Sequence, residues 1–395
     1  MTTESIAATG RGRPSGQHAL AVLRQQYDDR IGALRGRTGL VGTVGSTVPV
    51  ELILAAGKLP VLVAPEPPHP MPHADPWMEP EFAWELRSIV DRALRGDFEP
   101  LELLIVTRSY HEVYYYLKEI VRQGQGASVP PLHMYDLMQS QRTAVRPYGL
   151  GRTRELLARL ERLAGRPISD DNLRAAVALT NRRRRAIRAL LERRRQRHLS
   201  GTAAIRAIGA AYFMDPAAYV DTLEAFLRAL EPTPGLAGRP RLLLVPSEPL
   251  YHPTLHETLE AAGALVVAED DWWGARAAGR DIATDLPPLE AIFEKYFADT
   301  PTLAVSPRAP RETWLREQVE QGNLDAVVCY VPPSDHLFGW YYPALEEYLD
   351  VQGVPSLLLR QDVQDERGRE EISAALSELV RRLGPASQTA GREAV

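Results

Sequence analysis

The 395-residue chain is long enough for two or three domains, and its 45% hydrophobic and 25% charged residues are typical of a soluble globular protein. A formal net charge of -5 argues against nucleic acid as the main partner, because nucleic-acid-binding surfaces are strongly basic. The sequence contains no run of roughly 20 apolar residues that would span a membrane, and its first residues lack the apolar core of a secretory signal. We therefore expect a cytoplasmic protein without membrane contact.

The sequence from residue 17 to 148 alternates between helix and strand patterns, which predicts a first α/β lobe. Pro49 suits the first turn of a helix and Gly57 suits its end, between two apolar strand patterns. Such a strand–helix–strand unit predicts a parallel sheet with a right-handed crossover. In chain order we expect helices over 17–35, 49–56, 80–96 and 110–122, and strands over 40–44, 60–63, 101–107 and 130–137.

A helical segment over 149–235 joins this lobe to a second α/β lobe over 236–384. Its longest helix pattern opens with a capping signal at Ser169. The second lobe again alternates, and the chain ends, 1–16 and 385–395, are expected to be disordered. The predicted fold class is thus α/β, with two doubly wound, Rossmann-like parallel-sheet lobes joined by a helical segment. The second-lobe strands are expected within 239–246, 264–269, 324–331 and 354–360, and the helices within 252–263, 342–353 and 370–383.

The loops that follow the expected strands are the candidate site, because doubly wound sheets bind ligands outside the carboxyl ends of their strands. If the two lobes face each other, these loops line one cleft. The candidate residues in them are Ser46, Thr47, Arg108, Ser109, Glu248, Asp270, Asp271, Trp272, Asp335 and His336.

Two of these loops have alternative interpretations. The turn at Ser46 and Thr47 either holds an anion with its backbone N–H groups or simply caps the next helix. The pair Asp270–Asp271 binds a cation, acts as a general base or caps a turn. Trp272, which follows, lines an acyl pocket or packs between the lobes.

Asp335 and His336 place an acid next to an imidazole after the third strand of the second lobe. They are candidate acid–base residues with Ser46 as a further catalytic candidate, although adjacent residues of an extended chain point in opposite directions. A surface histidine without a role is the alternative for His336.

A dense basic run, Arg182–Arg185 and Arg193–Arg195, lies within one predicted helix. Consecutive residues of a helix are about 100° apart, so these arginines cannot share one face. They either point to solvent and neighbouring acids, or bind the phosphates of coenzyme A or an acidic partner. The single cysteine, Cys329, lies in an apolar strand and is expected to be a buried small hydrophobic residue.

Several segments together resemble the 2-hydroxyacyl-CoA dehydratase and benzoyl-CoA reductase subunits, in the order that this family has them, from about residue 18 to 383. Each segment alone is a weak signal, and their shared order and spacing carry the resemblance. The segments are GTVGSTVPVELILAAGKLPV (42–61), ISDDNLRAAVALTNRRRRAIRALLE (168–192), GALVVAEDDWWGAR (263–276) and NLDAVVCYVPPSDHLFGWYYPALEEYLDVQGVPSLLLRQD (323–362).

The resemblance implies two Rossmann-like lobes, a heterodimer of related subunits, and radical dehydration or reduction of a CoA thioester. It further implies a 4Fe–4S cluster held by cysteines in the strand-end loops, with electrons from an ATP-dependent activator protein. It also implies that Glu51, the glutamate retained after Pro49, contacts substrate, although its neighbour is Val50.

The cysteine positions of the family are changed in this chain. The first is Ser46, the loop of the second reads Thr107-Arg108-Ser109, and a later one is Asp335. Serine and aspartate oxygens are poor substitutes for thiolate as iron–sulfur ligands. We therefore expect no iron–sulfur cluster, and no other cofactor or metal, in this chain.

Three functions remain open at the level of sequence. The first is an enzyme of dehydratase, lyase or reductase type that binds an acyl- or aryl-CoA thioester between its lobes and uses acid–base chemistry or a partner. The second is a non-catalytic subunit that docks with a cluster-bearing relative, as a heterodimer, or with a second copy of itself. The third is a small-molecule binder that reuses the cleft.

Overall fold

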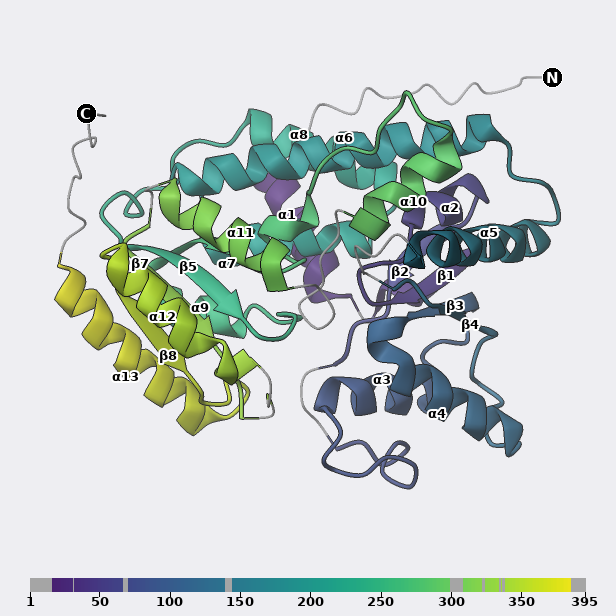
Figure 1. Cartoon of the computed structure of the whole chain (residues 1–395), viewed down its shortest axis with the longest axis horizontal. Coiled ribbons are helices and arrows are strands. Elements are labelled where there is room, and N and C mark those ends of the chain that lie inside the picture. Colours follow the sequence, from purple (N-terminus) through teal and green to yellow (C-terminus); the bar gives the residue numbers. More distant parts are fainter. Residues whose placement is uncertain are drawn as a thin grey trace, which may run out of the picture.

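The computed structural model describes residues 16–30, 32–66, 70–138, 144–298, 308–321, 324–333, 335 and 338–384, which form two parallel sheets surrounded by helices (Figure 1). The first sheet has the order β2-β1-β3-β4 and the second the order β6-β5-β7-β8, so both repeat the same pattern. The predicted α/β fold class with two parallel-sheet lobes is confirmed. The strands are β1 (Leu40–Val44), β2 (Leu59–Leu62), β3 (Leu101–Thr107), β4 (Leu132–Tyr135), β5 (Arg241–Pro246), β6 (Leu265–Glu269), β7 (Ala326–Tyr330) and β8 (Ser356–Leu359).

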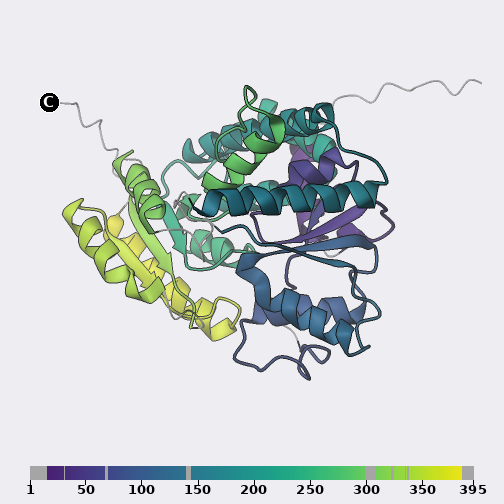
Figure 2. The same ribbon diagram turned by 45° about the vertical axis from the view of Figure 1, so that its right-hand side comes forward.

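Helices cover both faces of the first sheet because its strands are apolar on both sides. Leu103 and Ile105 belong to the core under α2 (Val50–Ala55) and α5 (Val145–Ala164). Leu104 and Val106 belong to the core that includes α3 (Trp84–Arg95) and α4 (His111–Arg122). Figure 2 shows α5 on one side of this sheet and α3 and α4 on the other.

The second sheet has the same layered construction. On one face, Leu244 and Val266 pack with α9 (Thr254–Ala261) and α13 (Glu366–Leu383). On the other face, Val245 and Val327 pack with α11 (Arg308–Glu320) and α12 (Tyr342–Val351). Short 3-10 turns follow several elements: η1 (Gly32–Leu34), η2 (Arg108–Tyr110), η3 (Ala210–Tyr212), η4 (Ala275–Ala277) and η5 (Phe338–Trp340).

The helical part of the molecule joins the two sheets. It contains α6 (Asp170–Arg195), α7 (Gly201–Gly209) and α8 (Pro216–Arg228), together with α1 (Gly16–Asp28), which packs on α7 and α8. Figure 1 shows α6 running over both sheets. The helix α10 (Pro288–Ala298) follows β6 in the chain but packs on α5 and α6, where Phe293 and Tyr296 enter the core beneath the first sheet. The chain therefore crosses between the lobes more than once.

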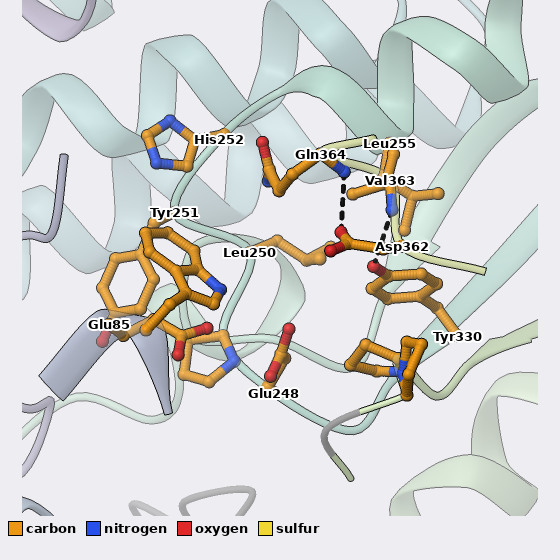
Figure 3. A pocket seen from close by; sticks show the side chains of 14 residues that line it. Glu85, Glu248, Leu250, Tyr251, His252, Leu255, Tyr330, Asp362, Val363 and Gln364 are labelled. Carbon is orange, nitrogen blue, oxygen red and sulfur yellow. Dashed lines mark hydrogen bonds between the residues drawn. The ribbon is translucent and has the colours of Figure 1, made fainter. Parts of the chain in front are cut away.

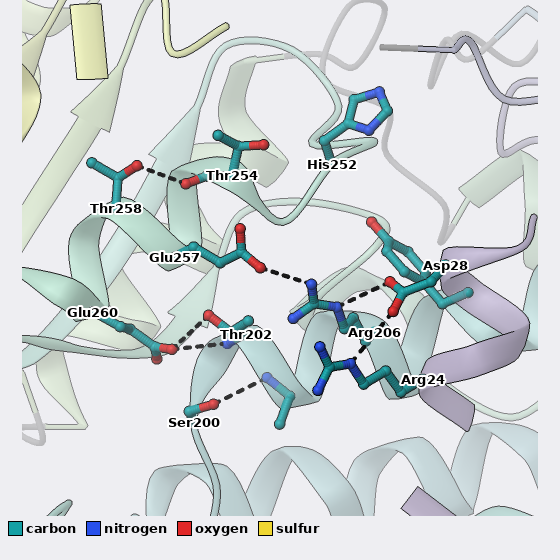
Figure 4. Close-up of polar contacts among 12 residues, drawn as sticks. Arg24, Asp28, Ser200, Thr202, Arg206, His252, Thr254, Glu257, Thr258 and Glu260 are labelled. Carbon is teal, nitrogen blue, oxygen red and sulfur yellow. Dashed lines mark hydrogen bonds and ion pairs between the residues drawn. The ribbon is translucent and has the colours of Figure 1, made fainter. Parts of the chain in front are cut away.

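Polar contacts fix α1, α7 and α9 to one another (Figure 4). Arg206 of α7 donates to Asp28 of α1 (3.2 Å) and to Glu257 of α9 (2.7 Å). The carboxylate of Glu260 accepts from the backbone N–H of Gly201 (2.6 Å) and Thr202 (3.1 Å) at the start of α7. Negative charge at a helix N-terminus is favourable, so this contact both caps α7 and ties it to α9.

The basic run of α6 pairs mostly with acids of neighbouring elements, as one of its alternatives predicted. Two arginines form buried ion pairs: Arg184 with Glu51 of α2 (2.7 Å) and Arg194 with Glu269 of β6 (2.8 Å). Exposed members of the same helix pair elsewhere, such as Arg185 with Asp281 (2.7 Å). The two buried ion pairs connect α6 to both lobes, and the arginines of the basic run point to different sides of this helix.

The predicted strand over 40–44 coincides with β1, and most other predicted elements agree within a few residues. The helix expected over 17–35 is shorter than predicted: α1 ends at Asp28, and η1 follows. Of the ends expected to be disordered, 1–16 and 385–395, all residues but one lie outside the described residues; the exception, Gly16, begins α1. Within the described ranges, no helix combines the length and apolarity that crossing a membrane requires.

Candidate functional site

The strand-end loops of both sheets meet at one cavity of about 210 Å³, here called the central cavity. In sheets with this strand order, the neighbouring loops diverge between β1 and β3 and between β5 and β7, which is where doubly wound proteins bind ligands. Ser46 and Ser109 follow β1 and β3, and Ser247 and Glu248 follow β5; all four line the central cavity. The two lobes therefore bring their ligand-binding edges together.

A second cavity, of about 260 Å³ and here called the carboxyl cavity, adjoins the first (Figure 3). It shares Glu85, Glu248, Pro249 and Tyr251 with the central cavity. Its further walls include Trp84, His252, Tyr330 and Asp362. An engineered cavity of about 150 Å³ holds benzene, so either space is large enough for an acyl or aryl group.

A third cavity of about 80 Å³, the basic cavity, shares Ser46 and Trp272 with the central cavity. Arg183 of α6, Arg276 after β6 and Lys295 of α10 line it. Arg276 pairs with Asp270, and Arg183 is half-buried and electrostatically close to Tyr212 and Tyr296. The basic run of α6 thus contributes one arginine to a cavity next to the strand ends.

Gly45 places Ser46 in the central cavity. Its φ is +94°, and a Cβ atom there would lie 2.2 Å from the hydroxyl oxygen of Thr107. Only glycine suits such a backbone conformation and such a close approach. The Thr107 hydroxyl donates to the carbonyl of Val44 (3.0 Å), which ties the end of β3 to the end of β1. Because α2 begins at Val50 with Pro49 as its N-cap, the alternative that Ser46 or Thr47 caps this helix is wrong.

Two carboxyl groups on the shared wall of the cavities have raised pKa values. Burial, and to a lesser degree Asp362, raises the pKa of Glu85 to about 7. Burial, followed by the charges of Glu85, Asp335 and Asp362, raises the pKa of Glu248 to about 9. Both groups therefore hold protons close to neutral pH, which is the condition for general acid–base chemistry.

Tyrosine hydroxyls line the central cavity beside these carboxyl groups. The hydroxyls of Tyr110 and Tyr251 are 2.5 Å apart, and Tyr27 donates to the carbonyl of Tyr251 (2.9 Å). The hydroxyl of Ser247 is buried and has no hydrogen-bond partner among the residues that the structure describes. One hydrogen of the tyrosine pair and the Ser247 hydroxyl remain available to a ligand, since each hydroxyl donates once.

The acids after β6 are engaged internally. Asp270 forms ion pairs with Arg276 and Arg311, and the buried Asp271 accepts from the backbone N–H of Leu250 (2.9 Å). Burial raises the pKa of Asp271 to about 8. Together with Trp272, which packs against Tyr251, these acids fix the shape of the cavity wall.

The structure brings together some of the residues predicted from the sequence. Ser46, Ser109, Glu248 and Trp272 line the central cavity. Asp335 accepts from the backbone N–H of Phe338 (2.7 Å), which caps η5, while its charge reaches Glu248. His336 lies outside the described residues.

Other predicted residues do not line any of these cavities. Thr47 is buried, and the carboxylate of Glu51 is taken up by Arg184 and by the hydroxyl of Tyr296 (2.9 Å). Arg108 pairs with Asp136 (2.8 Å) on the surface. Asp270 and Asp271 have the internal partners described above, so a contact between these residues and a substrate remains a prediction without geometric support.

Three residues that line the central cavity, Glu85, Tyr110 and Tyr251, were not among the candidates predicted from the sequence. Glu85 lies in the first turn of α3 and not in a strand-end loop. The available signal was helical spacing, because Glu85 precedes the buried Ile89 by four residues and Arg92 by seven, which places a glutamate on the buried face of the helix.

Comparison with known proteins identifies the family. The family model of the 2-hydroxyglutaryl-CoA dehydratase D-component matches residues 45–382. The chain belongs to this family. The matched range contains the segments that carry the site, because the β1 turn, α6 and both switch-point loops of the second sheet lie within it.

Two known proteins are similar to this D-component family member over much of its length. YjiM of Escherichia coli (strain K12), which carries the name of a dehydratase subunit, is 27% identical over 247 residues, covering 60% of this chain and 64% of YjiM. The chain thus spans less than two thirds of that relative. The (R)-phenyllactyl-CoA dehydratase beta subunit of Clostridium sporogenes is 19% identical over 336 residues, covering 82% of this chain and 86% of that subunit.

The residues of this D-component family member do not fit an iron–sulfur cluster. Its one cysteine, Cys329, lies in β7 with no exposed surface, and burial raises the pKa of its thiol to about 12, whereas a ligand must be a thiolate. The cavity walls offer hydroxyl and carboxylate oxygens instead. Among the described residues, no group of three or more His, Cys, Asp or Glu side chains is arranged to hold a metal ion.

Proposed function

We propose that this chain is a subunit of 2-hydroxyacyl-CoA dehydratase type that binds an acyl- or aryl-CoA thioester in the central cavity and has no iron–sulfur cluster of its own. The observation that carries the proposal is the meeting of both switch points at one cavity. Membership of the D-component family supports the substrate class.

The charge distribution supports an anionic thioester ligand. The basic cavity adjoins the central cavity through Ser46 and Trp272, and Arg183, Arg276 and Lys295 line it. Guanidinium groups suit phosphate recognition, so this side of the site is where we expect an anionic part of coenzyme A. The apolar and carboxyl walls on the other side would then surround the acyl or aryl group.

A second candidate function is that of a non-catalytic subunit that docks with a cluster-bearing relative. Its specific support is an exposed aromatic pair after β7: Trp340 is 84% exposed and Tyr341 is 44% exposed. Exposed aromatic side chains are enriched in protein interfaces. In that case an ATP-dependent activator would act on the partner. A heterodimer with a related subunit or a homodimer would use this surface.

Isothermal titration of the purified protein with a panel of acyl- and aryl-CoA thioesters tests the first function. We expect binding in the micromolar range, weakened by Arg183→Met and unchanged in the matched surface variant Arg381→Met. Absence of binding by every thioester, together with tight association with a cluster-bearing relative, would favour the second function. Binding of free small acids or nucleotides without any thioester would instead favour a small-molecule binder.

Iron analysis tests the cluster part of the proposal separately. We expect an anaerobically purified protein to be colourless and to contain no more than trace iron. Four iron atoms per chain in the isolated protein would contradict the proposal, because they would require several thiolate ligands.

A further inference from the structure

Glu85 and Glu248 come from different lobes and lie on one wall of the site. Glu85 is in α3 beside the first sheet, and Glu248 follows β5 of the second sheet. Both line the central cavity and the carboxyl cavity, and Figure 3 shows their carboxyl groups turned toward the same space. Glu85 is 8% exposed, and in the part of the chain that the structure describes its carboxyl group has no side-chain partner. Such a group is costly to bury unless a ligand or a proton satisfies it.

The charges around the pair are negative or neutral. Among the described residues that line the carboxyl cavity there is no arginine or lysine, and Arg30 contacts Nδ1 of His252. Burial and Arg30 lower the pKa of His252 to about 3, so this ring is neutral. The titratable groups that face the pair are Tyr110 from η2, Tyr251 and His252 after β5, Asp335 after β7, Tyr330 at the end of β7 and Asp362 after β8.

Two hydrogen-bond donors without a fixed acceptor complete the site. The Ser247 hydroxyl is buried and unpaired within the described part of the chain, and the Tyr110–Tyr251 pair retains one hydroxyl hydrogen. Both lie on the wall of the central cavity. Donors fixed in a cavity stabilise negative charge that develops on a carbonyl oxygen, which is what an enolate of a thioester requires.

We propose that Glu85 and Glu248 are catalytic residues that eliminate water from a 3-hydroxyacyl-CoA thioester, with the Ser247 hydroxyl holding the thioester carbonyl. This inference rests on the proposed binding of a thioester. The Glu85 carboxylate removes a proton from C2, the C3–O bond breaks, and the Glu248 carboxyl group gives its proton to the departing hydroxyl. The products are a 2-enoyl thioester and water, and one proton then passes from Glu85 to Glu248, which restores the pair without another reactant.

The position of the hydroxyl group follows from acidity. The thioester carbonyl acidifies the proton on C2, so a carboxylate can remove it when the leaving hydroxyl is on C3. In a 2-hydroxyacyl thioester the proton to be removed is on C3, where the carbonyl does not acidify it. A site that has only acid–base groups therefore selects the 3-hydroxy isomer.

The difference between the two carboxyl groups assigns their roles. The charge of Glu85 raises the pKa of Glu248, so Glu85 loses its proton first and Glu248 still carries one when Glu85 is ionised. Elimination should therefore be fastest where the pair holds a single proton, which gives the rate a bell-shaped dependence on pH. The rate falls on the acid side as Glu85 gains a proton and on the alkaline side as Glu248 loses one.

The test is deuterium exchange at C2 and formation of enoyl-CoA, measured by mass spectrometry with 3-hydroxyacyl-CoA substrates in heavy water. Glu248→Gln should lower elimination at least about a hundredfold while C2 exchange persists, because the base remains. Glu85→Gln should lower both. Glu119→Gln, on the exposed face of α4, is the matched control and should change neither.

The outcomes separate this inference from the proposed function. Thioesters that bind but show neither C2 exchange nor elimination would overturn the catalytic assignment and leave the binding function standing. Equal loss of exchange in both glutamine variants would overturn the division of roles. If no thioester binds at all, the proposed function fails first, and the inference fails with it.

Discussion

Replacing Arg184 by methionine would leave the carboxylate of Glu51 buried without its ion-pair partner. The side chains are 4% and 0% exposed, and the Nη2–Oε1 distance is 2.7 Å. At an effective dielectric constant of about 20, two unit charges at this separation attract by roughly 6 kcal/mol. Desolvation of both ions offsets most of that attraction, but removal of one partner leaves the other uncompensated, which costs about 3–5 kcal/mol. We expect Arg184→Met to lower the free energy of unfolding by that amount.

Urea denaturation followed by circular dichroism measures the effect, with the double variant Arg184→Met/Glu51→Met as the control. The double variant should recover most of the loss, because it buries no unpaired charge. Burial alone would raise the pKa of Glu51, but the charge of Arg184 and its hydrogen bond hold it below the ordinary value. The contribution of Glu51 is therefore present above the ordinary carboxyl pKa and is lost as the pH falls through the folded-state value. A loss below about 1 kcal/mol for Arg184→Met would refute the interpretation of a closed, water-free pair.

Three further predictions concern single positions. Gly45→Ala should destabilise the protein by at least about 2 kcal/mol and abolish ligand binding, measured by denaturation and titration, because its φ is +94° and the added Cβ meets Thr107. Burial raises the pKa of Asp271 from 3.8 to about 8 in the folded state, so the wild-type protein loses stability as the pH rises between those values. Asp271→Asn removes this carboxyl group and should make the free energy of unfolding less dependent on pH. Urea midpoints at pH 6 and pH 9 measure the difference. Cys329 should not react with a thiol reagent in the native protein, because it is buried in β7 and its pKa is raised to about 12, whereas rapid labelling would contradict its position.

The apolar patterns of the strands, and the glycine and proline residues at the ends of elements, were sufficient to predict the fold class. Apolar runs followed by polar turns gave β1 and most other strands, and Gly57 marked the end of a helix correctly. The sequence did not predict that α10 returns to the first sheet, because its apolar residues look the same whichever core they enter.

The part of the site that lies in strand-end loops could be predicted, because the topology of a parallel sheet places these loops together. Ser46, Ser109, Glu248 and Trp272 line the central cavity because the carboxyl ends of parallel strands share one edge. The ion pair of Glu51 was not predicted, because its partner, Arg184, is 133 residues away in the sequence. Contacts of this separation depend on how the helical part folds across both lobes, and no local pattern encodes them.

The return of α10 limits how this chain could be divided. A fragment that ended at residue 235 would contain every strand of the first sheet but would lack Phe293 and Tyr296, which fill the space beneath that sheet. Such a fragment would present an unfilled apolar surface to water and would tend to aggregate. Cutting or recombining this gene at the apparent border between the lobes would therefore separate a helix from the core to which it belongs.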